Sequence, residues 1–277
     1  MPMVETRDGT KLYVKDWNPT STEGTIVLIH GWPLNADSWE YQARPLAEAG
    51  YRVVSYDRRG FGRSEQPWHG YDYDTMADDL ADIVSALGIR DFTLAGFSMG
   101  GGEVARYMSR HAGKGVRKAA LISSIAPYML KTDDHKEGVP EDDLRAIGEE
   151  LKKDRQTFLK GFFKGFYGVG MMKHPVSDAV IDWSWNMAMM ASPQATLACA
   201  QAFGFTDLRG DMSAFTVPTL VVHGTGDDTV PIDATGRLAA KMIGGNAELT
   251  EYDGAPHGLT ATHGEKLATD LLTFMRV

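Results

Sequence analysis

Residues Phe92 to Gly102 read Phe-Thr-Leu-Ala-Gly-Phe-Ser-Met-Gly-Gly-Gly. The first four are apolar or β-branched and predict a buried strand, while the stretch from Gly100 onward is typical of a helix. Ser98 therefore stands between a strand and a helix, with a glycine two residues away on either side. This spacing indicates a nucleophile elbow, because small neighbours let the strand and helix approach around a strained serine. A dinucleotide-binding turn is disfavoured, since the Gly-x-Gly-x-x-Gly spacing is absent.

Short apolar runs of the kind that form strands buried between helices recur along the chain. They are Thr25 to His30, Tyr51 to Tyr56, Phe92 to Ala95, Lys118 to Ser123, Thr219 to His223 and Ala247 to Tyr252. Between them lie stretches typical of helices, notably Asp37 to Ala49, Asp74 to Leu87 and Gly100 to His111. The alternation predicts an α/β fold with a mostly parallel, doubly wound sheet. Residues Met1 to Trp17 are expected to form a hairpin around Asp8-Gly9.

The alternation of strands and helices is interrupted once, over residues 127–212, which are helical, irregular and rich in Met, Phe and Trp. We expect this segment to be an inserted helical cap, with residues 1–126 and 213–277 forming the core domain. The cap should lie over the carboxyl edge of the sheet, where open α/β sheets bind ligands. Most of its large apolar side chains, Met171 and Met172 included, are expected to pack the cap onto the core.

The charge and cysteine content of the 277-residue chain indicate which kinds of partner and which cellular compartment to expect. The chain has 28 Lys plus Arg and 37 Asp plus Glu, which gives a formal net charge of -9. Nucleic acids and anionic membranes are disfavoured as partners, because both usually need a basic surface. The single cysteine, Cys199, precludes an intramolecular disulfide and fits a reducing cytoplasm. With no secretion signal and no run near the roughly 18 apolar residues of a membrane span, we expect a cytoplasmic protein.

A serine is a weak nucleophile unless a histidine accepts its proton and a carboxylate orients that histidine. Asp227 follows the strand that ends at His223, and His257 follows the next strand, so both fall at carboxyl ends of strands, as Ser98 does. Ser98, Asp227 and His257 are therefore the candidate catalytic residues. Asp228 is the competitor for the acid. No histidine and carboxylate spacing typical of a metal site is present, so no metal is expected.

Acyl transfer also needs backbone donors for the oxyanion, usually from the residue after the nucleophile and from a loop after an earlier strand. Met99 meets the first requirement. In the loop His30-Gly31-Trp32-Pro33, Trp32 retains an N–H while Pro33 has none. We therefore expect the amides of Trp32 and Met99 to form the oxyanion hole.

These motifs together resemble the α/β-hydrolase superfamily, and within it the bacterial aryl-esterase, perhydrolase and cofactor-free haloperoxidase group. The resemblance covers nearly the whole chain. It is carried by His30-Gly31-Trp32-Pro33, the turn Asp57-Arg58-Arg59-Gly60-Phe61-Gly62-Arg63-Ser64, the elbow with Gly101-Gly102-Glu103-Val104-Ala105-Arg106-Tyr107, Phe166-Tyr167-Gly168, Thr206-Asp207 and Ala255-Pro256-His257-Gly258. One departure is Thr225, where the family often has an aspartate. We expect it to alter local hydrogen bonds, and the turn from Asp57 to Ser64 to be structural.

The resemblance implies a serine hydrolase that cleaves small aryl or alkyl esters through an acyl-enzyme and carries perhydrolase activity. Hydrogen peroxide would replace water in the second step, and the peracid would oxidise halide away from the protein, so no cofactor is implied. A homo-oligomer is implied by the habit of the family alone. A lactonase or γ-lactamase with the same triad remains an alternative, as does, more distantly, a ligand-binding receptor on this fold.

Pro33 bears on the subclass, because Trp-Pro at this place resembles the perhydrolases and haloperoxidases. A proline drives the preceding residue toward extended backbone angles, and so directs the Trp32 carbonyl. Our hypothesis is that this carbonyl accepts a hydrogen bond from hydrogen peroxide; a proline that only stiffens the loop is the alternative. The candidate substrate-binding residues are Pro33 and six apolar residues beside the triad loops or in the cap: Phe97, Phe162, Phe166, Phe203, Val230 and Leu259.

Overall fold

The computed structural model describes residues 3–276 and contains one eight-stranded sheet. Its strands are β1 (Met3–Glu5), β2 (Lys11–Trp17), β3 (Thr25–Ile29), β4 (Arg52–Tyr56), β5 (Phe92–Phe97), β6 (Val116–Ile122), β7 (Thr219–Gly224) and β8 (Ala247–Tyr252). Their spatial order is β1-β2-β4-β3-β5-β6-β7-β8. From β4 to β8 every neighbouring pair is parallel, while β2 runs antiparallel to β1 and β4.

The predicted α/β fold with a mostly parallel sheet is confirmed. Each strand predicted from an apolar run is present, and no end differs from its predicted position by more than two residues. The predicted N-terminal hairpin is also present: β1 pairs with β2, and the turn between them is closed by the Gly9 N–H, which donates to the Thr6 carbonyl at 2.8 Å. Residues 1–2 of that prediction lie outside the described residues.

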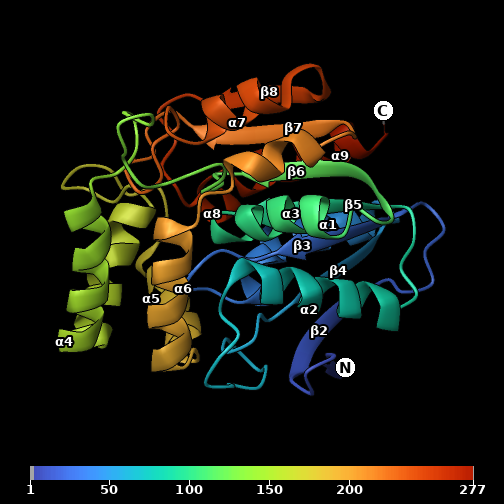
Figure 1. The fold of residues 1–277 in the computed structure, drawn as a ribbon, viewed down its shortest axis with the longest axis horizontal. Coiled ribbons are helices and arrows are strands. Elements are labelled where there is room, and N and C mark those ends of the chain that lie inside the picture. Colours follow the sequence, from blue (N-terminus) through green and yellow to red (C-terminus); the bar gives the residue numbers. More distant parts are fainter. Residues whose placement is uncertain (1–2, 277) are drawn as a thin grey trace.

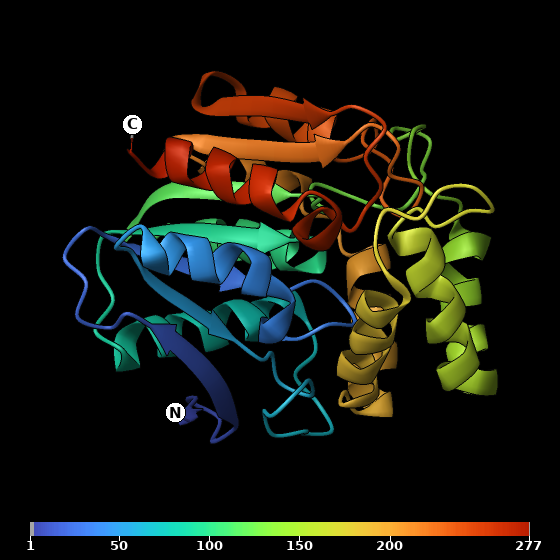
Figure 2. The same cartoon turned by 180° about the vertical axis from the view of Figure 1, so that it is seen from behind.

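Helices cover both faces of the sheet (Figures 1 and 2). One face carries α1 (Glu40–Glu48), α8 (Leu259–Thr262) and α9 (Gly264–Arg276), and the other carries α2 (Tyr73–Ala86), α3 (Met99–Arg110) and α7 (Gly236–Ile243). Short 3₁₀ turns are η1 (Ala36–Trp39), η2 (Arg209–Ala214) and η3 (Gly244–Asn246). The parallel strands are therefore buried on both sides, which explains why they read as continuous apolar runs.

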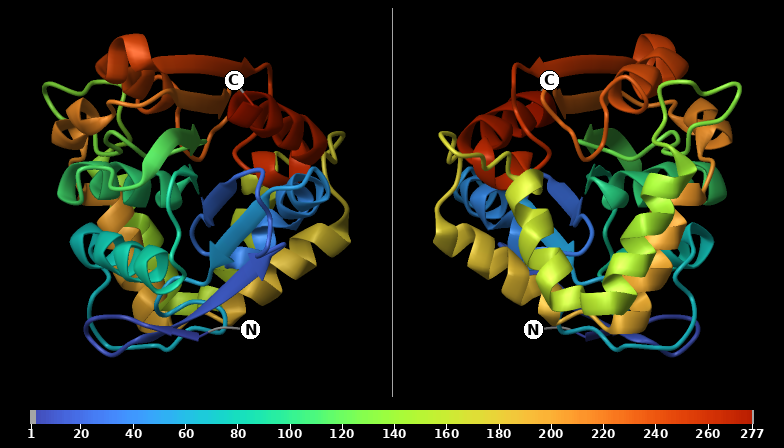
Figure 3. Two further views of the ribbon diagram at one scale, coloured as in Figure 1. Left: turned by 90° about the vertical axis from the view of Figure 1, so that its right-hand side faces the viewer. Right: turned by 90° about the vertical axis from the view of Figure 1, so that its left-hand side faces the viewer.

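Three further helices lie between β6 and β7 in the sequence: α4 (Glu141–Phe166), α5 (Asp178–Met189) and α6 (Pro193–Phe205). They stand together beyond the arrowheads of the strands, at the carboxyl edge of the sheet (Figures 2 and 3). Helix α4 is interrupted at Asp154, whose φ of -159° and ψ of 84° are not helical. Among residues 3–276, no helix has the length and apolar character needed to cross a membrane.

Most large apolar side chains of this helical segment are buried or partly buried, whereas Met171, Met172 and, to a lesser degree, Met190 are exposed. Phe163 and Phe166 of α4 are fully buried, and Phe158 and Phe162 pack partly against the core. Met171 and Met172, in contrast, are 99% and 97% exposed. The expectation that these two methionines pack onto the core is wrong, because they lie in the loop between α4 and α5 and outside the apolar face of either helix.

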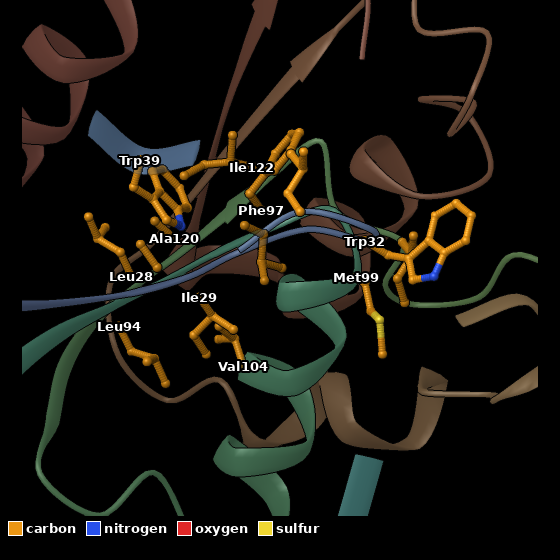
Figure 4. Packing of buried hydrophobic residues seen from close by; sticks show 14 of the residues in the cluster. Leu28, Ile29, Trp32, Trp39, Leu94, Phe97, Met99, Val104, Ala120 and Ile122 are labelled. Atoms are coloured by element: carbon orange, nitrogen blue, oxygen red, sulfur yellow. The ribbon is translucent and has the colours of Figure 1, made fainter. Parts of the chain in front are cut away.

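The main core lies between the sheet and the helices on its two faces (Figure 4). Leu28 and Ile29 of β3, Phe97 of β5 and Val104 of α3 are all fully buried within it. At the carboxyl edge of the sheet this core continues directly into Trp32 and Met99, which follow β3 and β5 (Figure 4). The backbone at the candidate site is therefore packed directly against the apolar core.

Candidate active site

The backbone at Ser98 adopts a conformation that side-chain-bearing residues avoid, with φ 55° and ψ -119°, between the end of β5 and the start of α3. The chain fits there because the residues two positions before and after Ser98, Gly96 and Gly100, have no side chain. A Cβ on Gly96 would lie 2.3 Å from the Gly100 carbonyl oxygen, and one on Gly100 would lie 2.5 Å from the Ile29 carbonyl oxygen. The close approach of helix and strand thus depends on the missing side chains, as the spacing in the sequence predicts.

A chain of hydrogen bonds joins Ser98, His257 and Asp227. The Ser98 Oγ lies 2.9 Å from His257 Nε2, and His257 Nδ1 lies 2.7 Å from Asp227 Oδ2. Because the carboxylate can only accept, His257 carries its proton on Nδ1, which leaves the Nε2 lone pair for the hydroxyl proton of Ser98. All three residues are buried, with Ser98 and Asp227 each 6% exposed and His257 1% exposed. The arrangement lets the imidazole take the serine proton.

Three hydrogen-bond donors and a second imidazole surround the carboxylate of Asp227. Its Oδ1 accepts from the backbone N–H groups of Thr229 at 3.0 Å and Val230 at 2.8 Å. Its Oδ2 contacts His257 Nδ1 at 2.7 Å and His223 Nε2 at 3.2 Å. Burial alone would raise the pKa of Asp227, but the two imidazoles and their hydrogen bonds hold this pKa well below its ordinary range. A permanent carboxylate is therefore available to orient His257.

The imidazole of His257 is also held by aromatic rings. The Phe97 ring lies 5.3 Å from it and the Phe166 ring 4.9 Å, measured between centroids. In addition, the Gly258 N–H donates to the Phe166 carbonyl at 2.8 Å, which ties the histidine loop to the end of α4. Phe97 and Phe166 therefore fix the plane of the candidate base.

Two backbone amides beside Ser98 have no acceptor. In the described part of the chain, neither the Trp32 N–H nor the Met99 N–H donates to a protein group. Met99 is the first residue of α3, and the N–H groups of a helix's first turn have no partner within the helix. The Trp32–Pro33 peptide bond is cis, and Trp32 belongs to the loop that follows β3, the strand beside β5. Two free donors thus lie on neighbouring strand ends, as an oxyanion hole requires.

The Trp32 side chain ties its loop to the inserted helices. The indole N–H donates to the Thr196 carbonyl of α6 at 3.0 Å. The ring makes edge contacts with Phe162 at 5.5 Å and Phe203 at 5.3 Å. The position of the Trp32 amide therefore depends on how α4 and α6 pack.

A buried ion pair lies beneath the two amides. Glu103 of α3 and Arg58, which follows β4, are both fully buried, and Arg58 Nε donates to Glu103 Oε2 at 2.8 Å. Arg58 Nη2 donates to the His30 carbonyl at 2.8 Å, and the Tyr56 hydroxyl donates to Glu103 Oε1. The pair thus joins the nucleophile helix to the Trp32 loop. This confirms the structural role expected for the turn that begins at Asp57.

A cavity of about 310 Å³ opens onto Ser98 and His257. This volume is at the lower end of the range for small-molecule sites. Its lining is mainly apolar and comes from the inserted segment and the loops after β3, β5, β6, β7 and β8. The lining residues are Trp32, Ser98, Ile125, Met129, Val139, Asp143, Leu144, Ile147, Phe158, Phe162, Phe203, Asp228, Thr229, Val230 and His257. Small apolar acyl or aryl groups fit such a space.

Of the seven candidate substrate-binding residues, Phe162, Phe203 and Val230 line this cavity. Pro33, Phe97, Phe166 and Leu259 are not among its lining residues. Sequence reasoning missed most of the wall, including Leu144 and Ile147 of α4. The signal available for these two was their spacing of three residues, which places them on one helix face.

The structure separates the two neighbouring aspartates by position. Asp227 is buried against His257, whereas Asp228 is exposed at the cavity and has no hydrogen bond or ion pair within residues 3–276. Thr225, the departure noted above, accepts a hydrogen bond from the Gly254 N–H through its Oγ1 at 2.7 Å. The threonine thus links the acid loop to the histidine loop. Residues 3–276 hold no cluster of three or more His, Cys, Asp or Glu side chains suited to a metal ion.

Comparison with known proteins places this architecture in a family. The family described as the alpha/beta hydrolase fold matches residues 24–263, so the chain belongs to the α/β-hydrolase family. It is 44% identical to a non-heme chloroperoxidase of Kitasatospora aureofaciens, over 99% of both chains. It is 38% identical to a bifunctional esterase/perhydrolase of Acinetobacter calcoaceticus, over the full length of both. Within the family it therefore belongs to the group of non-heme haloperoxidases and esterase/perhydrolases.

A solved structure agrees with this placement. The bromoperoxidase from Bacillus anthracis superposes with a TM-score of 0.95 at 42% identity, covering 100% of this chain and 99% of that one. The similarity therefore includes the helices between β6 and β7 as well as the sheet.

The strained turn at Ser98 generates a stability prediction. A residue held in such a conformation costs about 1–3 kcal/mol, and glycine is largely free of that cost. We predict that Ser98→Gly is more stable than Ser98→Ala by about 1 kcal/mol in urea denaturation. Ser213, exposed in η2, is the control, because there glycine should be the less stable substitution. The same order of stability at both positions would contradict a strained serine.

Proposed function

We propose that this protein is a serine hydrolase that cleaves small carboxylic esters through an acyl-enzyme on Ser98. His257 accepts the Ser98 proton as the Oγ attacks the ester carbonyl, and Asp227 stabilises the imidazolium that forms. The amides of Trp32 and Met99 donate to the tetrahedral oxyanion. His257 then protonates the departing alcohol or phenol, and the acyl group stays on Ser98.

The second half of the reaction returns the enzyme to its starting state. Water attacks the acyl group, gives its proton to His257 and releases a carboxylic acid. When hydrogen peroxide takes the place of water, the same step releases a peracid and regenerates the Ser98 hydroxyl. The peracid can then oxidise halide in solution, so the haloperoxidase reaction needs no redox centre in the protein.

The observation that carries this proposal is the Ser98–His257–Asp227 hydrogen-bond chain, which opens onto an apolar cavity. Hydrogen peroxide is proposed as the second substrate because of the activities named for the relatives. One relative is a bifunctional esterase/perhydrolase and another a non-heme chloroperoxidase, and this chain covers both almost completely. Solved structures named as lactone-degrading enzymes are under 25% identical and support only the shared fold.

The cavity also favours a particular charge on the substrate. Two carboxylates line it, Asp143 of α4 and Asp228 after β7, and no lysine or arginine does. Within residues 3–276 neither carboxylate has an ion pair, so their negative charge is uncompensated. We propose that neutral esters are the preferred substrates and that esters with a free carboxylate are disfavoured.

We further propose the organisation that surrounds this reaction. Residues 127–212 would act as a cap domain over the site, and residues 1–126 and 213–277 as the core domain that carries the triad. The protein would work in the cytoplasm as a homo-oligomer, with an ester and hydrogen peroxide as its small-molecule partners. The buried, unpaired Cys199 supports a reducing compartment.

The central prediction concerns Ser98. Wild type should release p-nitrophenol repeatedly from p-nitrophenyl acetate and form peracetic acid when hydrogen peroxide is added. Ser98→Ala should lower kcat by more than about a thousandfold, because no nucleophile remains. Ser213→Ala, an exposed serine in η2, serves as the matched control and should retain wild-type turnover. A single burst without turnover in wild type would instead support the receptor alternative.

A second prediction concerns Pro33. Proline has no N–H and constrains the backbone of Trp32, so its loss should misdirect the Trp32 carbonyl proposed to bind peroxide. We predict that Pro33→Leu lowers the ratio of perhydrolysis to hydrolysis measured on one ester. Pro175, in the loop between α4 and α5, provides a control, because Pro175→Leu should leave the ratio unchanged. An unaltered ratio in Pro33→Leu would mean that the proline only stiffens the loop.

A third prediction tests the charge of the cavity. At low salt, kcat/KM should be higher for p-nitrophenyl butyrate than for the p-nitrophenyl hemisuccinate anion. Asp143→Asn and Asp228→Asn should each reduce the ratio of the two kcat/KM values by about two- to threefold. This is the effect of one charge at about 8 Å in water. Asp142→Asn removes a neighbouring charge of α4 that does not line the cavity, and should have the smaller effect. Equal effects of all three substitutions would contradict a selective cavity.

A further inference from the structure

A second histidine contacts the candidate catalytic acid. His223 lies at the end of β7, four residues before Asp227, and its Nε2 is 3.2 Å from Asp227 Oδ2. The same oxygen accepts from His257 Nδ1 at 2.7 Å. His223 and Asp227 have side chains with no exposure to solvent. One carboxylate oxygen is therefore shared by two buried imidazoles.

The protonation of His223 follows from its neighbours. Its Nε2 also lies 2.9 Å from the Val230 carbonyl, so both groups near Nε2 are acceptors and this nitrogen carries the proton. Within residues 3–276, Nδ1 is buried and has no hydrogen-bond partner. A charged ring would leave a buried N–H on Nδ1 unpaired, which is costly. His223 is therefore a donor through Nε2, which is hydrogen-bonded to the Val230 carbonyl and lies 3.2 Å from Asp227 Oδ2.

The packing around His223 leaves no room for a side chain on α7 beside Nδ1. A Cβ on Gly236, at the start of α7, would lie 2.7 Å from Nδ1, so the backbone of α7 presses directly on the ring. A phenylalanine ring would satisfy packing at this place without an orphaned nitrogen. In the part of the chain that the structure describes, the polar contacts that the imidazole gains in return are those of Nε2 with Asp227 and Val230.

His30 shows what a loop-bracing histidine looks like in this fold. It lies directly after β3, which ends at Ile29, and like His223 it precedes a glycine. His30 Nε2 accepts from the Arg58 N–H at 3.0 Å, and its Nδ1 donates to the Gly31 carbonyl at 2.8 Å. Both of its nitrogens are used on loops and neither contacts Asp227. His223 differs because its Nε2 contacts both the Val230 carbonyl and Asp227 Oδ2, the oxygen that also accepts from His257.

We propose that His223 is a positioning residue for the serine hydrolase reaction, donating to Asp227 Oδ2 in competition with His257. The proposal rests on the function proposed above. The donation holds the carboxylate in the plane that His257 needs. It also withdraws negative charge from Oδ2, so the carboxylate stabilises the imidazolium form of His257 less strongly.

The charged groups around this pair come from every neighbouring element. Asp227 and the cavity carboxylate Asp228 follow β7, and Glu251 on β8 is the register partner of His223. Glu251 is paired with Arg237 of α7 at 2.7 Å, so its charge is compensated. Ser98 is neutral, and the rings of Phe97 and Phe166 cover His257. Asp227 is therefore the anion in direct contact with His223.

The test removes or replaces the N–H donor of His223 with side chains of similar size. His223→Phe removes the N–H, and His223→Gln can place an amide N–H near the position of Nε2. The measurement is the pH profile of kcat/KM for p-nitrophenyl acetate, with active sites titrated and Tm recorded. In His223→Phe we expect kcat to fall about tenfold from the misplaced acid. The acid limb, which reports the free base, should move up by about half a pH unit.

His223→Gln should restore most of kcat and return the acid limb toward the wild-type position. His111→Phe is the control, because His111 Nε2 contacts a carboxylate, Asp78, at 2.8 Å that is not part of the site. It should leave the profile unchanged. If His223→Phe does not fold, His223→Asn replaces it, since its shorter amide does not reach Asp227 and should shift the limb in the same direction.

Two results would overturn the proposal. Variants that lose Tm but keep wild-type kcat and acid limb per titrated site would show that His223 serves folding alone. A glutamine variant as impaired as the phenylalanine variant would show that the N–H is not what matters. A wild type that does not turn over the ester contradicts the proposed function itself, and with it the role of His223.

Discussion

The close approach of α3 to β3 and β5 is the constraint on which the rest of the site depends. Gly96 and Gly100 leave no room for a Cβ, and Ser98 between them is held in a conformation that other residues avoid. This contact places the Ser98 hydroxyl at the carboxyl edge of the sheet. It also sets the first amide of α3, that of Met99, next to the loop after β3. A nucleophile and an anion site therefore come from one turn of chain.

A buried ion pair between Arg58 and Glu103 also holds α3 against the sheet. Arg58 and Glu103 form a fully buried ion pair that also engages the His30 carbonyl and the Tyr56 hydroxyl. Burying two charges is unfavourable unless their remaining donors and acceptors are satisfied, and here several of them are. Because the pair spans α3 and the loop before Trp32, it sets the spacing of the two free amides. Positioning of the acid by His223 would be a second device of this kind.

How far the sequence predicts this structure depends on how local each feature is. The elbow at Ser98 is local, since strand, turn and glycines lie within a dozen residues. Asp227 and His257 could be chosen because each follows a strand, and parallel strands bring their carboxyl ends to one edge. The order of the chain thus brings together three side chains that are distant in sequence.

The wall of the cavity was predictable only in part, because it depends on tertiary packing. Phe97 and Phe166 are aromatic and close to the site, yet they pack on His257 and do not line the cavity. The inserted helices meet the core along faces that single positions in the sequence do not reveal. Met171 and Met172 show the same limit, since apolar composition suggested burial while a loop exposes both. The pairing of Arg58 with Glu103 likewise joins residues distant in sequence.

The most direct test of this account is to identify the residue that carries the acyl group. Wild type would be mixed with p-nitrophenyl acetate, quenched in acid within milliseconds and digested, and the peptides analysed by mass spectrometry. The account predicts one added acetyl group on the peptide that contains Ser98, lost on longer incubation and lost faster with hydrogen peroxide. Turnover with no label on Ser98, or with the label on another residue, would contradict it.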